Sequence, residues 1–347
     1  MLATATLLTM ALAGNVQAAE IRSVGPDGEA AVDASTIELT DDQIAQIKEG
    51  GYTAAICLHY GGNDWSTSQQ KGLEDTFGEL GIEIVAVTDA NFSAETQVSN
   101  IETVMAKKPD ILVSIPTDAT ATADAYKQAA AAGIKIVFMD QRADGLEAGK
   151  DYVSVVSADN YGNGYASGTV LGDALGGKGK VAMVYYDANF APTNQRDEGF
   201  RDAMKNYPDI EIVTEQGFTD ESGCAEQGDA ILTQFPNIDG IYASWDVPME
   251  GVLSAVRAAG MEGKVTLACN DLGNNVAREI ASGNIAGGGA QMPYDQGVAE
   301  AKLAALALLG EETPSYVAVP AETVTHENVL EAYTDVYLSL IHISEPT

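Results

Sequence analysis

A stretch that occurs twice constrains the fold of this chain more than any other feature. The first copy runs from Ile82 to Asp140 and the second from Ile210 to Asp271. Each copy alternates short runs rich in Ile and Val with Ala-rich segments of helical length. The apolar runs show almost no polar alternation, which is typical of strands buried on both faces of a parallel sheet. Each copy is therefore predicted to fold as strand, helix, strand, helix, strand.

Both copies end a strand on an aspartate, Asp140 in the first and Asp271 in the second. In an open α/β sheet, ligands bind outside the carboxyl ends of the strands. Two such lobes facing each other would place the two carboxylates on opposite walls of one cleft. The chain has 347 residues, which is enough for two domains of roughly 100–200 residues each.

The charge balance argues against several classes of partner. There are 51 acidic and 18 basic residues, giving a net charge of −33. Nucleic acids and anionic membrane surfaces both require clusters of Lys and Arg, so neither is expected as a partner. A well-solvated acidic surface and an adaptation to salty surroundings both explain the excess of acid, and composition does not separate them.

The three cysteines do not form a recognisable framework. They are too few and too scattered for a set of disulfides or for a zinc site. Cys57 and Cys269 fall inside apolar runs and are expected to be small core residues, whereas Cys224 could be exposed. A single disulfide remains open, and no metal ion or cofactor is expected.

The two ends of the chain differ from the rest. Residues 2–13 are apolar but too short to span a bilayer, and Val16-Gln17-Ala18 supplies the small residues of a signal-peptidase site. Residues 1–18 are therefore predicted to be a signal peptide, although the usual basic start is missing, so that the true start lies upstream or the first Met is internal. Residues 338–347, LSLIHISEPT, resemble a translated sequencing-library adapter, so we expect the natural chain to be interrupted near Tyr337.

Loops that follow predicted strands carry further candidate contacts. Trp65 lies in a Gly- and Asn-containing loop after the first strand, where it is either a ligand contact or ordinary packing. Arg196 follows another strand and can aim a planar fork of donors at a ligand, a surface ion pair being the alternative. The run Gly287 to Gly289 in a strand-like stretch indicates close approach of a ligand or of another backbone.

Two other motifs are weak. Gly162 to Gly168 reads G-x-G-x-x-x-G, in which the third glycine comes one residue late for a dinucleotide site, and no acidic residue follows at the usual distance. Asp187 begins a D-x-N pattern, but Pro192 stands where a calcium-binding loop needs glycine. Neither nucleotide nor calcium binding is therefore expected.

From Tyr52 to Tyr337 the chain resembles the type I periplasmic binding proteins, above all the ribose-binding and related monosaccharide-binding members of ABC importers. The resemblance implies an α/β fold of two Rossmann-like lobes with parallel-type sheets, a three-strand hinge and a ligand cleft between the lobes. It implies a periplasmic monomer that hands a sugar or polyol to an ABC transporter permease. The implied lobes are residues 19–157 with 292–322, and residues 158–291 with 323–337.

The resemblance also implies a set of ligand-binding residues. The family's arginine after the first aspartate is replaced by Gln141, with Arg142 one position late, and its asparagine before an aspartate is replaced by Trp245. Compared with the family's pocket, this one is thus expected to lack one cation and one small amide and to contain an additional indole. This difference argues against ribose itself as the ligand, but not against the class of sugar-binding proteins. The ligand-binding positions are Asn63, Trp65, Ser66, Asp140, Gln141, Arg196, Phe218, Trp245, Asp271 and Gln291.

The chemistry of these side chains suits an uncharged polyhydroxylated ligand. Each strand-end carboxylate can accept paired hydroxyl donors, and a hydrogen bond to a charged group contributes about 1.5–3 kcal/mol. Aromatic faces of Trp65, Phe218 and Trp245 would cover the apolar face of a sugar ring. Arg196 balances one carboxylate, whereas an anionic ligand would need more than one cation. Helix capping or simple solvation is the alternative role for the two aspartates.

Other functions of the same fold need features that the sequence lacks. A repressor would need a basic helix-turn-helix before the first lobe, but residues 1–50 combine an export-like segment with an acidic stretch. Two acids across a cleft could hydrolyse a glycoside, yet no G-x-S-x-G, H-E-x-x-H or Cys/His pair appears. His59 and His326 are expected to be structural, and no catalysis is expected. A receptor that presents a sugar to a chemosensor stays open.

Overall fold

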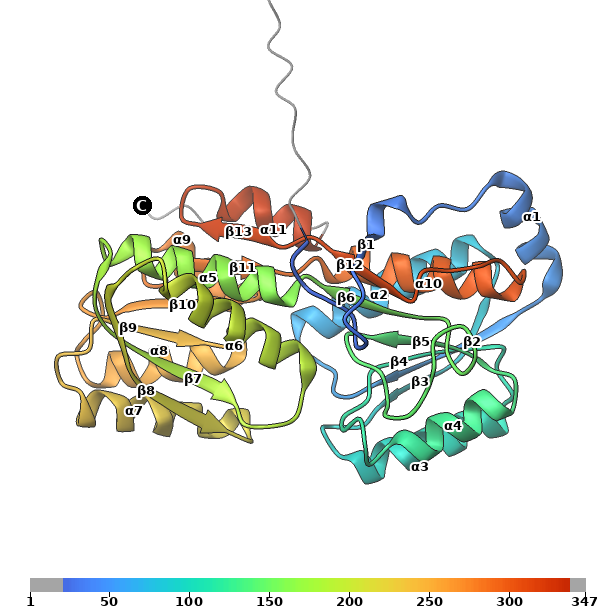
Figure 1. Ribbon diagram of the computed structural model, residues 1–347, viewed down its shortest axis with the longest axis horizontal. Helices are drawn as coiled ribbons and strands as arrows, with labels where there is room; N and C mark the ends of the chain where they lie inside the picture. Colours follow the sequence, from blue (N-terminus) through green and yellow to red (C-terminus); the bar gives the residue numbers. More distant parts are fainter. Residues whose placement is uncertain (1–20, 338–347) are drawn as a thin grey trace, which may run out of the picture.

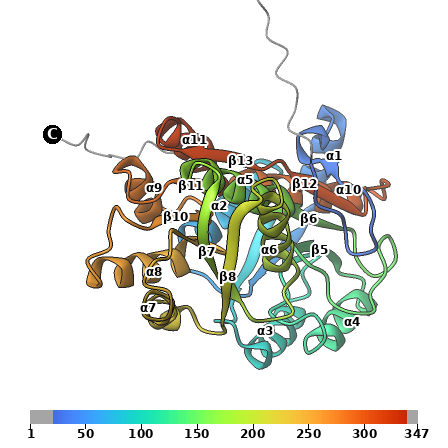
Figure 2. The same cartoon turned by 60° about the vertical axis from the view of Figure 1, so that its left-hand side comes forward.

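The computed structural model describes residues 21–337. The predicted signal peptide in residues 1–18 and the adapter-like residues 338–347 lie outside the described residues. Two lobes lie side by side along the long axis of the molecule, and each has a sheet with helices on both faces (Figure 1, Figure 2). The α/β fold with two parallel-dominated lobes, predicted from the repeat and the family resemblance, is confirmed.

Within the described residues the first lobe contains a sheet of seven strands in the order β1-β12-β6-β5-β4-β2-β3, and every neighbouring pair is parallel. The strands are β1 (Val32–Asp33), β2 (Thr53–Leu58), β3 (Glu83–Asp89), β4 (Ile111–Ser114), β5 (Lys135–Met139), β6 (Ser154–Ala158) and β12 (Tyr316–Val319). The helices are η1 (Ala34–Thr36), α1 (Asp41–Gly50), α2 (Asp64–Glu79), α3 (Ala94–Ala106), α4 (Ala123–Ala131) and α10 (Pro293–Leu308).

The sheet of the second lobe has six strands in the part of the chain described, ordered β13-β11-β10-β9-β7-β8, and only β13 runs antiparallel to its neighbour. The strands are β7 (Lys178–Tyr186), β8 (Asp209–Phe218), β9 (Gly240–Ala243), β10 (Thr266–Asn270), β11 (Gly287–Ala290) and β13 (Glu322–Thr325). The helices are α5 (Asn160–Ala174), α6 (Ala191–Met204), η2 (Glu221–Gly223), α7 (Cys224–Gln234), α8 (Asp246–Ala258), α9 (Asn274–Ala281) and α11 (Val329–Tyr337).

The doubled stretch folds as predicted. Its first copy is β3-α3-β4-α4-β5 and its second is β8-α7-β9-α8-β10. Strands β4, β5, β9 and β10 are almost wholly buried, but β3 and β8 are half exposed. The prediction of burial on both faces is therefore wrong for these two strands, because each is the edge strand of its sheet and helices cover an edge incompletely.

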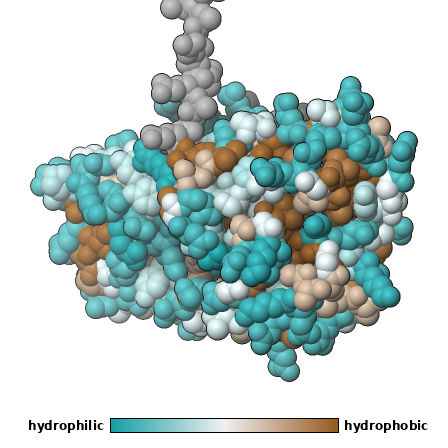
Figure 3. Space-filling model, turned by 45° about the vertical axis from the view of Figure 1, so that its right-hand side comes forward, coloured by the Kyte–Doolittle hydropathy of each residue, from teal (hydrophilic) through white to brown (hydrophobic). Residues whose placement is uncertain are grey.

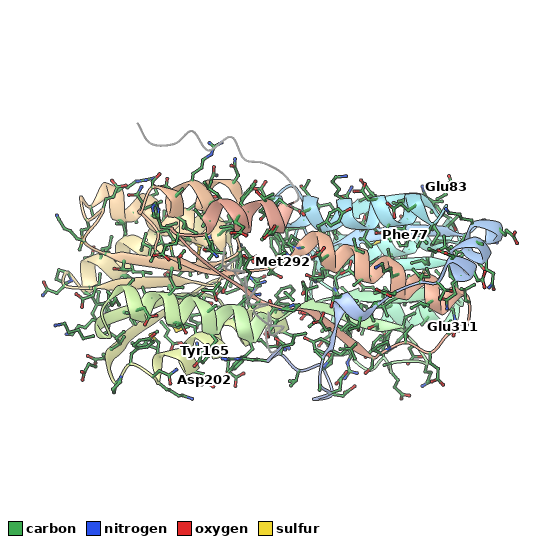
Figure 4. All side chains as sticks on the ribbon, turned by 90° about the horizontal axis from the view of Figure 1, so that it is seen from above. Phe77, Glu83, Tyr165, Asp202, Met292 and Glu311 are labelled. Carbon is green, nitrogen blue, oxygen red and sulfur yellow. The ribbon has the colours of Figure 1, made fainter. Side chains whose placement is uncertain are left out.

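Three connections cross between the lobes and form the predicted hinge. They join β6 to α5, β11 to α10, and β12 to β13. Met292, in the second of these, lies at the junction between the lobes (Figure 4). The arrowheads of β7, β8 and β9 point toward the first lobe (Figure 1), so the carboxyl ends of these strands face the junction.

The glycine run in β11 is explained by a close approach of other backbone. A Cβ atom at Gly288 would lie 1.6 Å from the carbonyl oxygen of Cys269, and one at Gly289 would lie 2.3 Å from that of Asn163 in α5. Only glycine lets α5 and β10 pack this closely against the strand, so the second of the two alternatives holds.

The structure also shows where the three cysteines lie. Cys57, Cys224 and Cys269 are all buried with free thiols, so Cys224, for which exposure was left open, is a core residue like the other two. Its side chain belongs to the core between α7 and α8.

Hydrophilic side chains dominate the face in Figure 3, with hydrophobic ones gathered mainly on the right-hand side of that view. Across residues 21–337, no helix is both long and apolar enough to cross a membrane.

Candidate functional site

Asp140 and Asp271 follow equivalent strands, β5 and β10, and leave the sheets in the same way. The Asp140 amide donates to the carbonyl of Val156 at 2.8 Å, and the Asp271 amide donates to that of Gly289 at 2.9 Å. Both backbones are left-handed, with φ of 53° and 67°, which is uncommon outside glycine and typical of ligand-binding positions. Both side chains line one cavity between the lobes.

The carboxylate of Asp140 is held from behind by the first lobe. Its Oδ1 accepts hydrogen bonds from the Ser157 hydroxyl at 2.9 Å and from Gln296 Nε2 at 3.0 Å. Burial raises the pKa of Asp140, while the charge of Arg196 and these hydrogen bonds oppose the rise. The side chain is thus fixed in position and remains an acceptor for donors that enter the cavity.

The carboxylate of Asp271 belongs to a network on the second lobe. Gln291 Nε2 donates to its Oδ1 at 2.6 Å, and Arg196 Nη1 donates to its Oδ2 at 3.2 Å. Arg196 Nε also donates to Asn160 Oδ1 at 2.8 Å. Burial lowers the pKa of Arg196, but Asp271 and Asp140 more than offset this, so its pKa lies above the usual value and it stays charged.

Asp246, at the start of α8, supports this network without lining the cavity. Its Oδ1 accepts from the amide of Val247 at 2.8 Å and its Oδ2 from that of Gly273 at 2.9 Å. Burial and the charge of Asp271 raise the pKa of Asp246, which favours its neutral form. Asp246 therefore fixes the loop after Asp271 and adds little charge to the site.

Aromatic rings of the first lobe form one wall of the cavity. The His59 ring meets Tyr60, Trp65 and Phe92 edge-on, with centroids 4.7, 5.8 and 5.3 Å away. It stacks on Phe190 of the second lobe at 5.6 Å. Burial lowers the pKa of His59 to about 3, so the ring is neutral at neutral pH and packs as an aromatic side chain.

A second aromatic wall comes from the other lobe. The Tyr186 ring meets Trp245 edge-on at 5.6 Å and Phe190 edge-on at 6.1 Å. Trp245 Nε1 donates to Glu221 Oε1 at 2.8 Å, which fixes the plane of the indole. The space between the two walls, counted together with its opening to solvent, is about 440 Å³, and aromatic faces surround the acidic strand ends.

Most of the residues predicted from sequence meet at this cavity. Seven of the ten line it: Asn63, Trp65, Asp140, Arg196, Trp245, Asp271 and Gln291. They come from both lobes and lie up to 228 positions apart in the sequence, counted from Asn63 to Gln291, and the carboxyl ends of the strands bring them together.

The other three predicted residues lie behind or beside the cavity. The Ser66 hydroxyl donates to the carbonyl of Asn63 at 3.2 Å within the first turn of α2. Gln141 Nε2 donates to the Pro116 carbonyl at 2.8 Å, and its Oε1 accepts from the amide of Ala191 at 3.0 Å, so it links the lobes. Phe218 packs behind Trp245 at 5.0 Å.

Several lining residues were not predicted. His59 and Tyr60 directly follow β2, and Tyr186 ends β7. The strand-end rule that singled out the aspartates applies equally to these aromatic residues. Phe92 and Phe190 lie in loops beyond their strands, where no sequence signal marks them. Within residues 21–337, no three His, Cys, Asp or Glu side chains gather as a metal site.

Comparison with known proteins places the chain in a family. A family model described as "Periplasmic binding protein domain" matches residues 54–312. The D-ribose/D-allose-binding protein of Pseudomonas aeruginosa is 29% identical over 273 residues, covering 76% of this chain and 83% of the relative. The D-allose-binding periplasmic protein of Escherichia coli is 26% identical over 255 residues, covering 72% and 82%.

Solved structures agree in fold over nearly their whole length. An ABC transporter periplasmic solute-binding protein from Actinobacillus succinogenes with bound D-allose has a TM-score of 0.74 at 28% identity, covering 80% of this chain and 99% of its own. A solute-binding protein from Agrobacterium vitis with bound α-D-tagatopyranose has a TM-score of 0.77 at 26% identity, covering 82% and 98%. The two-lobed fold, its shared cavity and the family match together show that this chain belongs to the type I periplasmic binding proteins.

Proposed function

We propose that the protein captures a neutral monosaccharide or related polyol between its lobes and delivers it to the permease of an ABC importer. One observation carries the proposal: Asp140 and Asp271 line the same aromatic-walled cavity with Arg196 beside them. These groups accept hydroxyl donors and cover the apolar face of a ring. The ligand-binding role extends to the seven lining residues predicted from sequence.

The charges of the site favour a neutral ligand. Arg196 is already paired with Asp271 and bonded to Asn160, so it is not free to neutralise an anion. A sugar phosphate or sugar acid would meet the carboxylate of Asp140 without a cation of its own. The relatives named for ribose and allose, and the structures holding D-allose and tagatose, bind neutral sugars of this kind.

Contacts between the lobes describe a closed state. The amide of Asn274 donates to Asp64 Oδ2 at 2.7 Å, and Ala191 donates to Gln141 Oε1 at 3.0 Å. Each bond joins one lobe to the other and would break on opening. A ligand that contacts both lobes stabilises the closed state, because only that state offers it both walls.

The wider role follows from the family. We place the protein in the periplasm as an exported monomer without catalytic activity, with lobes of residues 19–157 with 292–322 and residues 158–291 with 323–337. The connection from β12 to β13 supports a boundary close to residue 322, because β12 belongs to the first sheet and β13, which begins at Glu322, belongs to the second. Closure would then present both lobes to the permease in one fixed geometry.

A thermal-shift screen followed by calorimetry tests the proposal. The panel consists of pentoses, hexoses, deoxysugars and polyols, with sugar phosphates and sugar acids as charged controls. At least one neutral compound is expected to raise the melting temperature and to bind at micromolar affinity or tighter, about −8 kcal/mol. Absence of binding across the whole neutral panel would contradict the proposal, as would a preference for the charged controls.

A further inference from the structure

A second hollow lies directly outside the cavity and shares its aromatic walls. Tyr60, Asn63, Phe92, Tyr186 and Trp245 line both spaces. The outer hollow also reaches residues 61–62 in the first lobe and residues 219–221 in the second. These five residues therefore border both the inner cavity and a space that leads to solvent.

Phe92 is held at this boundary by an unusual backbone. Asn91 and Phe92 are consecutive left-handed residues, with φ of 47° and 59°, and the amide of Phe92 donates to the His59 carbonyl at 2.8 Å. Its ring stacks on Tyr60 at 4.2 Å and still has 38% of its surface exposed. Strained backbone of this kind is kept where a side chain must hold a functional position. The loop thus holds an apolar ring toward the outer space.

The opposite wall supplies polar acceptors. Glu221 is half-buried and accepts from Trp245 Nε1 through Oε1. Among the described residues, no hydrogen bond joins its Oε2 to a protein donor. In the first lobe, a Cβ at Gly62 would meet no atom within 4 Å, so the outer hollow is open beside this residue. An aromatic platform facing a carboxylate acceptor is the same combination that suits a sugar ring in the inner cavity.

We propose that the outer hollow is a subsite for a second ring, so that the ligand is a glycoside whose sugar occupies the inner cavity. This inference rests on the proposed sugar-binding function. The inner sugar contacts Asp140 and Asp271, and its outward oxygen carries a ring that packs between Phe92 and Trp245. When the second ring is itself a sugar, Glu221 Oε2 accepts a hydrogen bond from one of its hydroxyls.

Paired ligands test the subsite. The best-binding free monosaccharide of the panel is compared by calorimetry with its methyl and phenyl glycosides, in both anomeric forms. One phenyl glycoside is expected to bind about fivefold or more tightly than the matching methyl glycoside, the range of a single aromatic contact. A smaller gain or a loss in both anomers, with the free sugar still binding, overturns the subsite alone. Failure of every sugar and glycoside overturns the proposed function as well.

A variant pair locates the effect. Thr219 is exposed and lines only the outer hollow, so Thr219→Trp fills that space without touching the inner cavity. Thr103→Trp, on the exposed side of α3, is the matched control. Thr219→Trp is expected to weaken binding of the phenyl glycoside tenfold or more and to leave the free sugar within twofold, while Thr103→Trp changes neither. Equal weakening of both ligands, or of neither, by Thr219→Trp overturns the proposal.

Discussion

Asp140 and Asp271 share one backbone conformation at equivalent places in the two sheets, with φ of 53° and 67°. Each amide bonds to the neighbouring strand, Asp140 to Val156 and Asp271 to Gly289. A left-handed non-glycine residue costs of order 1–3 kcal/mol and persists where its surroundings enforce it. Both halves of the molecule therefore carry the same local strain at a position that lines the cavity.

The strain predicts an order of stability among variants of Asp140. Asp140→Gly and Asp140→Ala both remove the carboxylate and its bonds to Ser157 and Gln296. Glycine takes positive φ without penalty, so Asp140→Gly is expected to be more stable than Asp140→Ala by about 0.5–1 kcal/mol, after its greater loss of chain entropy. Urea unfolding of the two variants checks this. An alanine variant as stable as the glycine variant would show that the backbone is unstrained.

Arg196 is predicted to matter far more than another arginine of the same helix. Arg196→Ala leaves the buried Asp271 carboxylate without its cation, which is expected to cost about 3–5 kcal/mol and to abolish sugar binding. Arg201→Ala breaks only a half-exposed pair with Glu215 and is expected to cost about 0–1 kcal/mol with binding retained. Unfolding midpoints and calorimetry compare the two. Similar losses in both variants would argue against a buried network in the site.

Glu300 predicts a pH dependence of stability. It lies fully buried in α10, where Gln69 Nε2 donates to its Oε1 at 2.6 Å. Glu300 Oε2 and Gln69 Oε1 have no partner among the described residues, and a proton on the carboxyl would join these two atoms. Burial, with the charge of Asp140, raises the pKa of Glu300 well above its usual range. The folded state therefore holds this proton more tightly than the unfolded chain.

The direction of the effect follows from that difference. The protonated Glu300 carboxyl makes its full contribution to folding stability below the unfolded pKa of about 4.3. This contribution is lost as the pH rises toward the folded-state pKa, by up to about 1.4 kcal/mol per pH unit. Glu300→Gln removes the titration and keeps a reciprocal pair with Gln69. Relative to the wild type, this variant is expected to gain stability between pH 5 and pH 8 in urea unfolding. Glu102→Gln, exposed on α3, is the control, and a constant difference between Glu300→Gln and wild type would contradict the account.

Closure is predicted to depend on Asp64. Its carboxylate accepts from the amide of Asn274 across the cleft at 2.7 Å, a bond that exists only when the lobes meet. Asp64→Ala is expected to weaken sugar affinity about threefold to tenfold, the range of an ordinary hydrogen bond. Glu74→Ala, on the same helix and bonded only to Gln70 among described residues, is expected to leave the affinity unchanged. An unchanged affinity in Asp64→Ala would show that this contact does not stabilise the closed state.

Much of the architecture could be predicted because it is encoded locally. The apolar runs and Ala-rich segments of the repeat are enough to give the order of strands and helices, and the strand-end rule brings Asp140, Asp271 and Arg196 together. Edge position could not be predicted, because it depends on pairing between distant strands. That is why β3 and β8 are more exposed than their composition suggests.

The finer geometry of the site depends on contacts that a sequence does not display. Gln141 follows Asp140 directly, yet its amide turns to Pro116 and Ala191 and does not line the cavity. Phe92 lines the cavity from a loop whose backbone is left-handed at two consecutive residues. The polar sequence around it contains no pattern that predicts this conformation. Side-chain direction after a strand end is therefore set by tertiary contacts, whereas the strand end itself is set by local pattern.

The central claim is that Asp140 and Asp271 bind a neutral sugar through hydrogen bonds from opposite walls of one cavity. Calorimetry with the tightest-binding sugar, on the wild type and on Asp140→Asn and Asp271→Asn, tests it most directly. Asparagine keeps the shape and tolerates the left-handed backbone, so each variant removes mainly the charge. Each is expected to lower the affinity about tenfold or more, the value of a charged hydrogen bond. An affinity that stays at the wild-type value in both variants would contradict the account.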